Sequence, residues 1–482
     1  MTSSSPPTGD ISVPITRVVL VAATAALGGF LFGFDTAVIN GAVSAIGEQF
    51  STGPLLLGFS VASALIGCAI GAWFAGRIAD RFGRIRVMLL AAALFVLSSL
   101  GCGLAFGIWD LSFWRVIGGL GVGAASVIAP AYIAEVSPPP YRGRLGSLQQ
   151  MAIVTGIFVA LLTDAAIVAA AGSSTEPWLF GLEAWRWMFL SELVPAVIYG
   201  LLALTIPESP RYLIARGELV KAKSVLSRYV GGDVEKTTTD ILQTVKGASD
   251  RPRFSILRGK AFGLLPIVWV GIGLSVLQQF TGINVIFYYS TTLWQAVGFT
   301  EQDSLTITVI TSVTNIVTTI VAILLIDRIG RKPLLLVGAI GQFACLAVLA
   351  VMFATAPIVD GEPVLDGAAG PIALIAANLY VVFFGASWGP VVWVLLGEMF
   401  SNRIRAVALS VAAAAQWAAN FVISTTFPAL AAVGLGLAYG IYTFFAFAAI
   451  FFVIRFVRET KGRTLESMDD GDRPIPTVGS GA

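Results

Sequence analysis

Twelve long apolar runs, separated by short polar segments, dominate the pattern of hydrophobic and polar positions along the chain. They cover residues 17–40, 54–75, 86–107, 109–134, 145–170, 185–206, 261–290, 304–326, 333–354, 371–396, 404–428 and 435–456. Each run is close to the length of about 20 residues that an α-helix needs to cross a bilayer. The pattern therefore predicts an all-α integral membrane protein with twelve transmembrane helices.

Composition agrees with a membrane protein and excludes several kinds of site. The 482 residues are 56% hydrophobic and 12% charged, which is about half the charge of a soluble protein. Histidine is absent, so triads and metal sites built on histidine are excluded. Cys68, Cys102 and Cys345 lie in apolar runs without CxxC spacing, and we expect small core residues there. No metal site and no cofactor are predicted.

Positive charge falls on one side of the predicted membrane. The segments after the second, fourth, sixth, eighth and tenth runs carry most of the Lys and Arg, whereas the alternate loops carry mainly Asp and Glu. Lys and Arg remain on the cytoplasmic side of a membrane. We therefore expect segment 207–260 and both termini to lie in the cytoplasm.

Three polar motifs occur twice and in the same order. Residues 80–84 (Asp-Arg-Phe-Gly-Arg) match 327–331, Glu135 and Arg142 match Glu398 and Arg405, and the segment around Glu208 matches that around Glu459. Such pairs indicate a duplicated architecture. The predicted units are a tail (1–16), a six-helix bundle (17–206), an amphipathic segment of short surface helices (207–260), a second bundle (261–456) and a tail (457–482).

Three amide side chains interrupt the seventh run. Gln278, Gln279 and Asn284 are costly inside a membrane unless they face a cavity or a partner. A break of the helix at Gly282 would let these amides converge. Amides both donate and accept hydrogen bonds, which suits a ligand made of hydroxyl groups. The alternative is that they only join neighbouring helices.

Two opposite charges lie within the predicted membrane, Asp35 in the first run and Arg115 in the fourth. A lone buried charge is costly, so we expect them to pair or to titrate, as a proton-coupled carrier requires. A permanent structural ion pair is the alternative. Glu192 is expected to tune this pair, and Asp164, near the outer end of the fifth run, is expected to be solvated.

Acidic and basic residues recur at matching positions on the cytoplasmic side of both halves. A solvated charged loop is the default interpretation of any one of them. Their recurrence predicts salt bridges between spans that act as a reversible latch and hold the outward-open state. The predicted latch comprises Asp80, Arg84, Glu135, Arg142, Glu208, Asp327, Arg331, Glu398, Arg405 and Glu459.

Several longer motifs, in order along the chain, carry a family resemblance. They include Gly33-Phe34-Asp35-Thr36-Ala37-Val38-Ile39-Asn40-Gly41, both Asp-Arg-x-Gly-Arg loops, Pro207-Glu208-Ser209-Pro210-Arg211, Gln278-Gln279-Phe280-Thr281-Gly282-Ile283-Asn284 and residues 388–398. On these motifs the chain resembles the sugar porters of the major facilitator superfamily. Residues 184–189 and 415–420 are similar to the bacterial proton–pentose and proton–hexose symporters within it. The chain departs from the family pattern at Ile85, usually arginine, and Arg458, usually proline.

The resemblance implies a sugar pocket and a path for its coupling ion. It assigns to the pocket Gln150, Ile153, Gln278, Gln279, Asn284, Tyr288, Asn315, Trp393, Gln416 and Trp417. Phe32 and Tyr289 are expected to gate this pocket. Symporters of the family carry an aspartate at the position of Asp35, so the resemblance favours proton coupling there.

The sequence therefore predicts symport of a monosaccharide with a proton across a bacterial plasma membrane. Glucose is the first candidate substrate and xylose the second. An energy-independent sugar facilitator is the alternative, and a sugar sensor or a membrane enzyme is less expected. The predicted partners are the sugar, the proton and the lipid bilayer, without nucleic acid, and the expected state is a monomer.

Overall fold

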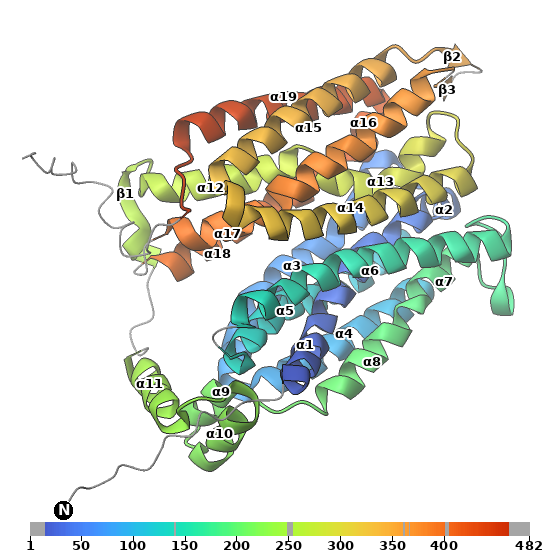
Figure 1. Ribbon diagram of the computed structural model, residues 1–482. Helices are drawn as coiled ribbons and strands as arrows, with labels where there is room; N and C mark the ends of the chain where they lie inside the picture. The colour runs from blue at the N-terminus through green and yellow to red at the C-terminus, as the bar shows by residue number, and fades with distance from the viewer. Residues whose placement is uncertain are drawn as a thin grey trace, which may run out of the picture.

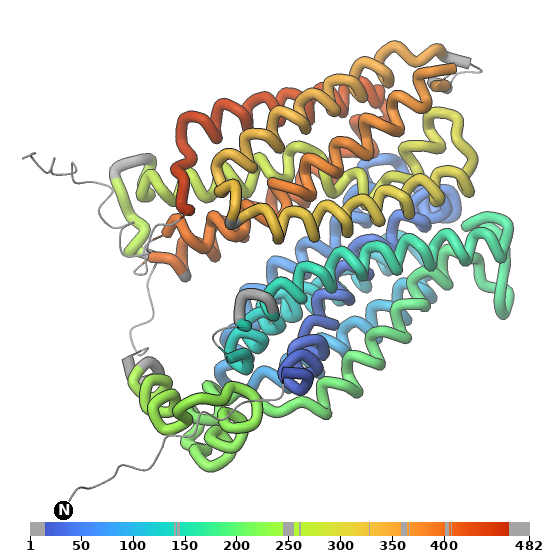
Figure 2. Tube along the Cα trace, viewed as in Figure 1, coloured from blue at the N-terminus to red at the C-terminus, as the bar shows by residue number. Residues whose placement is uncertain are grey.

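Two groups of membrane-spanning helices form the body of the molecule. The computed structural model describes residues 15–138, 141–247, 254–359, 362–365, 367–400 and 404–461. In these ranges twelve helical segments are long and apolar enough to cross a bilayer, as the sequence predicts. The chain builds the lower group first, in blue to green, and then the upper group, in yellow to red (Figure 2).

The first group contains the helices that precede the basic central segment (Figure 1). Its elements are α1 (Ile15–Ala37), α2 (Ile39–Gln49), α3 (Pro54–Phe82), α4 (Arg84–Gly103), α5 (Ile108–Val136), α6 (Arg142–Ala171), η2 (Leu179–Gly181), α7 (Ala184–Ser191) and α8 (Leu193–Ala203). Here α1 packs against α5 and α6, and α3 packs against α5. A Cβ on Gly119 of α5 would lie 1.9 Å from the Ala64 carbonyl oxygen of α3, so only glycine allows this approach.

The second group lies above the first in Figure 1 and follows the same order of long helices. Its elements are α12 (Pro266–Phe280), α13 (Ile283–Gln295), α14 (Glu301–Ile329), α15 (Arg331–Ala354), β2 (Ile358–Val359), β3 (Glu362–Pro363), α16 (Ala369–Phe383), η5 (Phe384–Trp388), α17 (Gly389–Met399), α18 (Arg405–Val433) and α19 (Leu435–Phe456). Strands β2 and β3 form a short antiparallel hairpin. Helices α15 and α19 pack together, as do α12 and α18.

Short elements connect the two groups, as the amphipathic central segment predicts. They are α9 (Pro210–Ala215), α10 (Leu219–Val225), the π-helical η3 (Leu226–Val230), α11 (Val234–Gly247), η4 (Phe254–Leu257) and β1 (Arg258–Ala261). Apolar side chains of α9, α10 and η3, including Leu213, Ala222 and Leu226, form a small core of their own. The division into domains at 206/207 and 260/261 stays a prediction.

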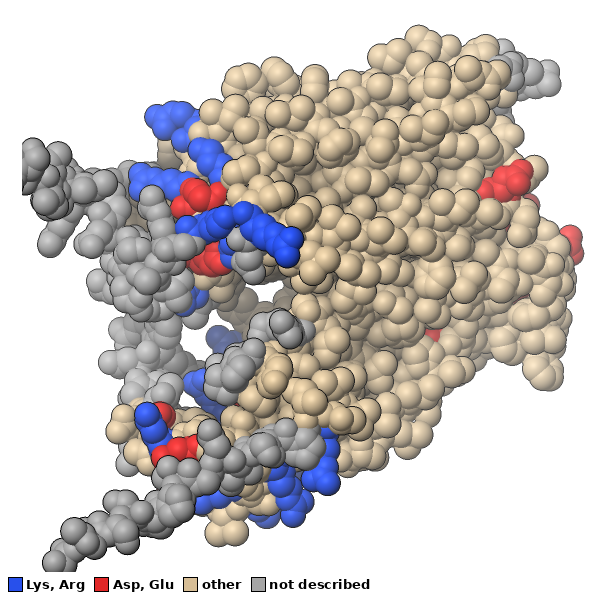
Figure 3. All heavy atoms as spheres, viewed as in Figure 1, with Lys and Arg blue, Asp and Glu red and all other residues tan. Residues whose placement is uncertain are grey.

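The two ends of the molecule differ in charge. Lys and Arg gather at the end that carries α9 to α11, while the flank of the helices is almost free of charge on the face shown (Figure 3). We call this end, marked by Arg77, Arg81, Arg328 and Lys332, the basic end. At the basic end the molecule is hollowed between the two groups (Figure 3).

The groups meet at the opposite end, where α2 lies against α13. The Asn40 amide nitrogen donates to the Phe287 carbonyl oxygen at 3.0 Å, and its amide oxygen accepts from the Thr291 hydroxyl and backbone N–H. The Ser44 hydroxyl donates to Gln295 Oε1 at 2.9 Å. The first span therefore extends beyond the predicted residue 40, because the buried residues of α2 continue its packing.

Candidate functional site

The predicted break in the seventh span lies at Gly282. Helix α12 ends at Phe280 and α13 begins at Ile283, and Gly282 between them has φ 84° and ψ 18°. This left-handed conformation favours glycine. A Cβ at Gly282 would also lie 2.7 Å from Cδ2 of Tyr442 in α19. Backbone conformation and packing therefore both require glycine at the break.

The break brings the three amides of this span together. The Asn284 amide nitrogen donates to Gln279 Oε1 at 2.5 Å, and Gln279 Nε2 donates to Gln278 Oε1 at 3.3 Å. Gln278 Nε2 in turn donates to the Trp388 carbonyl oxygen at 2.8 Å. Trp388 ends the π-helical turn η5, directly before α17. The amides therefore form one hydrogen-bonded chain that connects two interrupted helices.

Side chains predicted to line the pocket also occur on α17 and α18. The ring of Trp417 on α18 lies 6.1 Å, centre to centre, from that of Phe32 on α1, across the interface of the two groups. Gln416 is half-buried, and its Oε1 is buried without a hydrogen-bond partner among the described residues. Trp393 on α17 is 43% exposed. Gln416 therefore offers an acceptor without a partner among the described residues, and part of the Trp393 surface is accessible.

Gln150 and Ile153 lie half-buried on α6. A Cβ on Gly33 would sit 2.0 Å from the Ile153 carbonyl oxygen, so α1 and α6 touch at this level. Helix α1 therefore brings Phe32 and Asp35 to the same layer as the predicted residues of α6.

The remaining predicted residues lie within the second group. The Tyr288 hydroxyl accepts from the Asn420 amide nitrogen at 3.5 Å, and the Tyr289 hydroxyl donates to the Ser424 carbonyl oxygen at 2.7 Å. Asn315 on α14 is buried against Gly385 of η5. No hydrogen bond connects these three to the chain of amides within the described residues. They flank it on α13 and α14.

Asp35 and Arg115 form the predicted pair between α1 and α5. Arg115 Nη1 lies 3.5 Å from Asp35 Oδ2 and donates at 2.8 Å to the Asp35 backbone oxygen. Both side chains are almost completely buried. Nothing larger than glycine fits at position 118 beside them, because a Cβ there would lie 2.8 Å from Asp35 Oδ1. Among the described residues, Arg115 is therefore the one cation paired with this buried carboxylate.

Glu192 is buried at the junction of α7 and α8. Its Oε2 accepts from the Ser99 hydroxyl at 2.9 Å, and its Oε1 has no partner in the described part of the chain. The structure thus places a second carboxyl group in the interior of the first group. Its tuning of the Asp35–Arg115 pair stays a prediction.

The expectation that Asp164 is solvated is wrong. Its side chain is fully buried, because α2 and α7 cover this face of α6. Asp164 Oδ2 accepts from the backbone N–H of Gly41 at 3.3 Å. The sequence shows how far along α6 this residue lies, but not which helices surround it.

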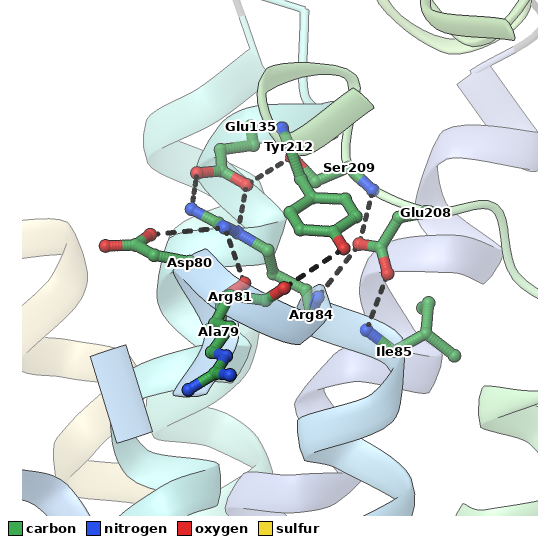
Figure 4. A network of polar contacts seen from close by, with 9 residues as sticks. All are labelled: Ala79, Asp80, Arg81, Arg84, Ile85, Glu135, Glu208, Ser209 and Tyr212. Atoms are coloured by element: carbon green, nitrogen blue, oxygen red, sulfur yellow. Dashed lines mark hydrogen bonds and ion pairs between the residues drawn. The ribbon is translucent and has the colours of Figure 1, made fainter. Parts of the chain in front are cut away.

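The first predicted network at the basic end centres on Arg84, the first residue of α4 (Figure 4). Its guanidinium donates twice to Glu135 of α5, at 2.9 and 3.0 Å. Glu208 accepts from the backbone N–H groups of Arg84 and Ile85, and so caps the N-terminus of α4. The Ser209 hydroxyl donates to Glu135 at 2.5 Å. The network therefore joins α4, α5 and the start of α9.

The second network repeats this arrangement around Arg331, the first residue of α15. Its guanidinium donates to Glu398 at 2.8 and 3.0 Å, and the Thr460 hydroxyl also donates to Glu398. Glu459 accepts from the backbone N–H groups of Arg331 and Lys332. Burial acts to raise the pKa of Glu459, but these and neighbouring backbone N–H groups together hold its pKa below the ordinary value.

The first network lies within the first helix group and the second within the second, and among the described residues no hydrogen bond or ion pair of either network joins the two groups. Asp80 lies 3.4 Å from Arg84 but is largely exposed. Arg405 donates to the Phe400 carbonyl oxygen at the end of α17, through Nε and Nη2. The side chains of Arg142 and Asp327 lie outside the described residues. The role of these residues as a latch stays a prediction.

Two polar residues of the site were not predicted. Asn40 makes the hydrogen bonds between α2 and α13, and Gln149 is buried beside Gly29 with both amide atoms unpartnered among the described residues. Gln149 and Gln150 form a glutamine pair like Gln278 and Gln279, and this signal could have identified Gln149. Asn40 lies in a motif that the sequence already singled out, but its partners depend on how the two groups meet.

The sequence matches the family described as "Sugar (and other) transporter" over residues 21–471. This match includes most of the first span and all of the others. The chain belongs to this sugar transporter family. Membership confirms the predicted class, a transporter rather than an enzyme.

Relatives in this family are similar over nearly their whole length. The glucose transport protein of Synechocystis sp. is 62% identical over 468 residues, which cover 97% of this chain and 99% of the relative. The D-xylose-proton symporter of Escherichia coli is 38% identical, covering 92% and 94%. The inward open conformation of the xylose transporter XylE from E. coli superposes with a TM-score of 0.77 at 37% identity, covering 94% and 99%. The predicted major facilitator fold is thereby confirmed.

Proposed function

We propose that this transporter carries a monosaccharide, with glucose the first candidate and xylose the second, by symport with protons. The observation that carries the proposal is the chain of amides at the broken seventh span, Gln278, Gln279 and Asn284. It offers uncharged donors and acceptors where two helices are interrupted. The glucose transport protein and the D-xylose-proton symporter described above support this choice of substrates.

A neutral sugar presents hydroxyl groups at its edge and an apolar ring face. Amides satisfy the first, and aromatic rings such as Trp393 and Trp417 cover the second. Gln416 Oε1, which has no partner among the described residues, can accept a hydrogen bond from a hydroxyl. The proposed pocket residues are Gln150, Ile153, Gln278, Gln279, Asn284, Tyr288, Asn315, Trp393, Gln416 and Trp417. Several neutral hydrogen bonds of about 1 kcal/mol each correspond to micromolar to millimolar binding.

Proton coupling is assigned to Asp35 with Arg115, and Glu192 tunes this pair. Protonation of Asp35 removes the charge that holds the Arg115 guanidinium and so permits rearrangement of α1 against α5. Their 3.5 Å separation supports this role, because it is longer than a charge-assisted hydrogen bond. The carboxyl group then loses its proton on the other side of the membrane.

The basic end is proposed to face the cytoplasm of a bacterium, with both termini on that side and the protein in the plasma membrane. The gathering of Lys and Arg there supports this orientation. The hollow at that end then makes this an inward-open state, with α2 against α13 closing the outside. The likeness to the inward open XylE structure agrees with that state.

Alternating access follows from rocking of the bundles 17–206 and 261–456 about the central site. The Glu135–Arg84 and Glu398–Arg331 pairs stiffen the cytoplasmic end of each bundle, and the proposed latch brings these ends together in the outward-open state. The two bundles of one chain enclose a complete path. We therefore propose a monomer.

The test is uptake of radiolabelled glucose and xylose into proteoliposomes, with and without an inside-alkaline pH gradient. The wild type should accumulate sugar only with the gradient. Asp35→Asn should lose accumulation while it retains exchange of internal for external sugar. Equilibration without accumulation, unchanged in Asp35→Asn, would instead establish a facilitator. The likeness to the D-xylose-proton symporter supports symport over that alternative.

A further inference from the structure

Asp164 is a buried carboxyl group that the proposed mechanism does not use. It lies seven residues before the end of α6 at Ala171, or about 10 Å from the outer end of that helix. Its Oδ2 accepts the 3.3 Å hydrogen bond from the Gly41 N–H. Its Oδ1 is buried without any hydrogen-bond partner in the described ranges. Among the described residues, one of its two oxygens therefore has no hydrogen bond to replace those that water would make.

No counter-charge stabilises this carboxyl group within the described residues. The elements packed against α6 are α1, α2, α5, α7 and α14. Their charged residues, with those flanking α7, are Arg17, Asp35, Glu48, Asp110, Arg115, Glu135, Glu183, Arg186, Glu192, Glu301, Asp303, Asp327 and Arg328. Two of these arginines have carboxylate partners elsewhere, Arg115 in Asp35 and Arg186 in Glu183. No ion pair to Asp164 is present in the part of the chain that the structure describes.

An ionised carboxylate in such a place is unstable. Burial removes the water that stabilises its charge, and a single backbone N–H replaces only part of that stabilisation. A proton on Oδ1 removes the charge and leaves Oδ2 as the acceptor for Gly41. The closed surroundings of Asp164 therefore favour the neutral acid.

Gly41 connects Asp164 to the interface that closes the outer end. Gly41 lies in the first turn of α2, and a Cβ there would sit 2.9 Å from both Asp164 Cβ and Met188 Sδ, so this junction has no spare room. The preceding residue, Asn40, binds Phe287 and Thr291 of α13. Separation of α2 from α13 would loosen this junction and admit water from outside.

We propose that Asp164 is a second proton-binding site, which takes up a proton from the outer solution when the outer end closes. The inference rests on the proposed function, in particular on the orientation and on alternating access. On closure the carboxylate and one proton form a carboxyl group, and no other bond changes. On reopening the proton returns to the same outer solution. Asp164 therefore makes closure depend on external pH without carrying a proton across, whereas Asp35 carries the coupled proton.

A thiol probe at the outer interface tests this proposal. The Thr425 hydroxyl is buried without a partner among the described residues, and the Thr425 carbonyl oxygen lies against Gly58 of α3, between the two groups. Thr425→Cys would place a thiol there, while the native cysteines are all buried. Labelling by a membrane-impermeant maleimide is measured on intact cells from about pH 5 to about pH 8.

The matched control is the same probe with Asp164→Asn, which keeps the shape and the acceptor but cannot titrate. The labelling rate of the probe variant that retains Asp164 is divided by the rate of the variant that also carries Asp164→Asn. This ratio cancels the pH dependence of the thiol itself. We expect this ratio to rise with external pH, by up to about tenfold per pH unit for one linked proton. A ratio independent of pH would overturn the proposal. Asp164→Leu, also unable to titrate, serves as the control if Asp164→Asn does not fold.

A second readout separates this site from the coupling site. Protons taken up per sugar, measured with a pH-sensitive dye in proteoliposomes, should be equal in wild type and Asp164→Asn. A lower ratio in the variant would mean that Asp164 carries a transported proton, and would overturn the proposal. The labelling ratio does not depend on transport. It can therefore prove independent of pH, which overturns the present proposal, while the wild type still accumulates sugar with the gradient. Loss of the proposed symport would appear instead in the uptake assay on wild type and Asp35→Asn.

Discussion

Arg115 holds the backbone of Asp35 more closely than it holds the carboxylate of the same residue. Its Nη1 lies 2.8 Å from the Asp35 carbonyl oxygen and 3.5 Å from Oδ2. The guanidinium therefore keeps a hydrogen bond to α1 when the carboxylate is neutralised. Protonation of Asp35 loosens the contact between α1 and α5 without abolishing it, which suits a reversible step.

This geometry predicts how a double-mutant cycle should behave. Arg115→Gln leaves the Asp35 carboxylate buried without a cation, and should lower the free energy of unfolding by about 3–5 kcal/mol. Adding Asp35→Asn removes the stranded charge and should restore most of that loss. Thermal unfolding of the detergent-solubilised single and double variants measures both effects. Additive losses in the double variant would show that the two side chains do not interact.

Gln279 occupies the middle of the chain of amides, so its loss should cost more than one hydrogen bond. Gln279→Ala removes the partner of Asn284 and strands hydroxyl groups of a bound sugar. We expect at least about tenfold weaker glucose binding, measured by calorimetry on the solubilised protein. The control is Gln342→Met, because Gln342 is a fully buried amide on α15, outside the chain of amides. Equal affinities in Gln279→Ala and wild type would contradict the pocket.

The break at Gly282 makes a prediction about stability. Gly282→Ala forces a side chain into φ 84° and against the Tyr442 ring. We expect a loss of about 1–3 kcal/mol in unfolding free energy, together with weaker sugar binding as the amides move apart. Gly440→Ala is the matched control, since a Cβ there meets nothing within 4 Å in the interior of α19. That variant should be unchanged or more stable by up to about 1 kcal/mol.

Features that depend on short stretches of sequence were predicted well. Long apolar runs specify spans because the bilayer has a fixed thickness, and the placement of Lys and Arg separates the two ends. The repeat is equally local, since Gly83 and Gly330 adopt the same conformation, with φ 99° and 103°. The glycine between the amide residues likewise predicted the break at Gly282, because the preference of glycine for a left-handed conformation is also a local property. Each of these signals is complete within a few turns of helix.

Features that depend on how helices face one another were not predictable. Asp164 is buried because α2 and α7 cover it, and position along α6 does not reveal that. Asn40 binds α13 where the two groups meet, and the sequence does not show which helices meet there. Arg405 binds the Phe400 carbonyl oxygen rather than a carboxylate, because the end of α17 offers an acceptor nearby. Rotation and packing of helices decide all three.

The cap that Glu459 places on α15 predicts a pH-dependent stability. Because its folded pKa lies below the ordinary value of 4.5, its contribution is complete above that value and is lost as pH falls through the folded pKa. Glu459→Gln should therefore lower the unfolding free energy by about 1 kcal/mol near neutral pH, and by less at about pH 3, where the carboxylate is being protonated. Glu48→Gln, at an exposed position of α2, should have no effect at either pH. Unfolding in detergent at both pH values measures the difference; a Glu459→Gln effect that persists undiminished in acid would mean that shape, and not charge, stabilises the start of α15.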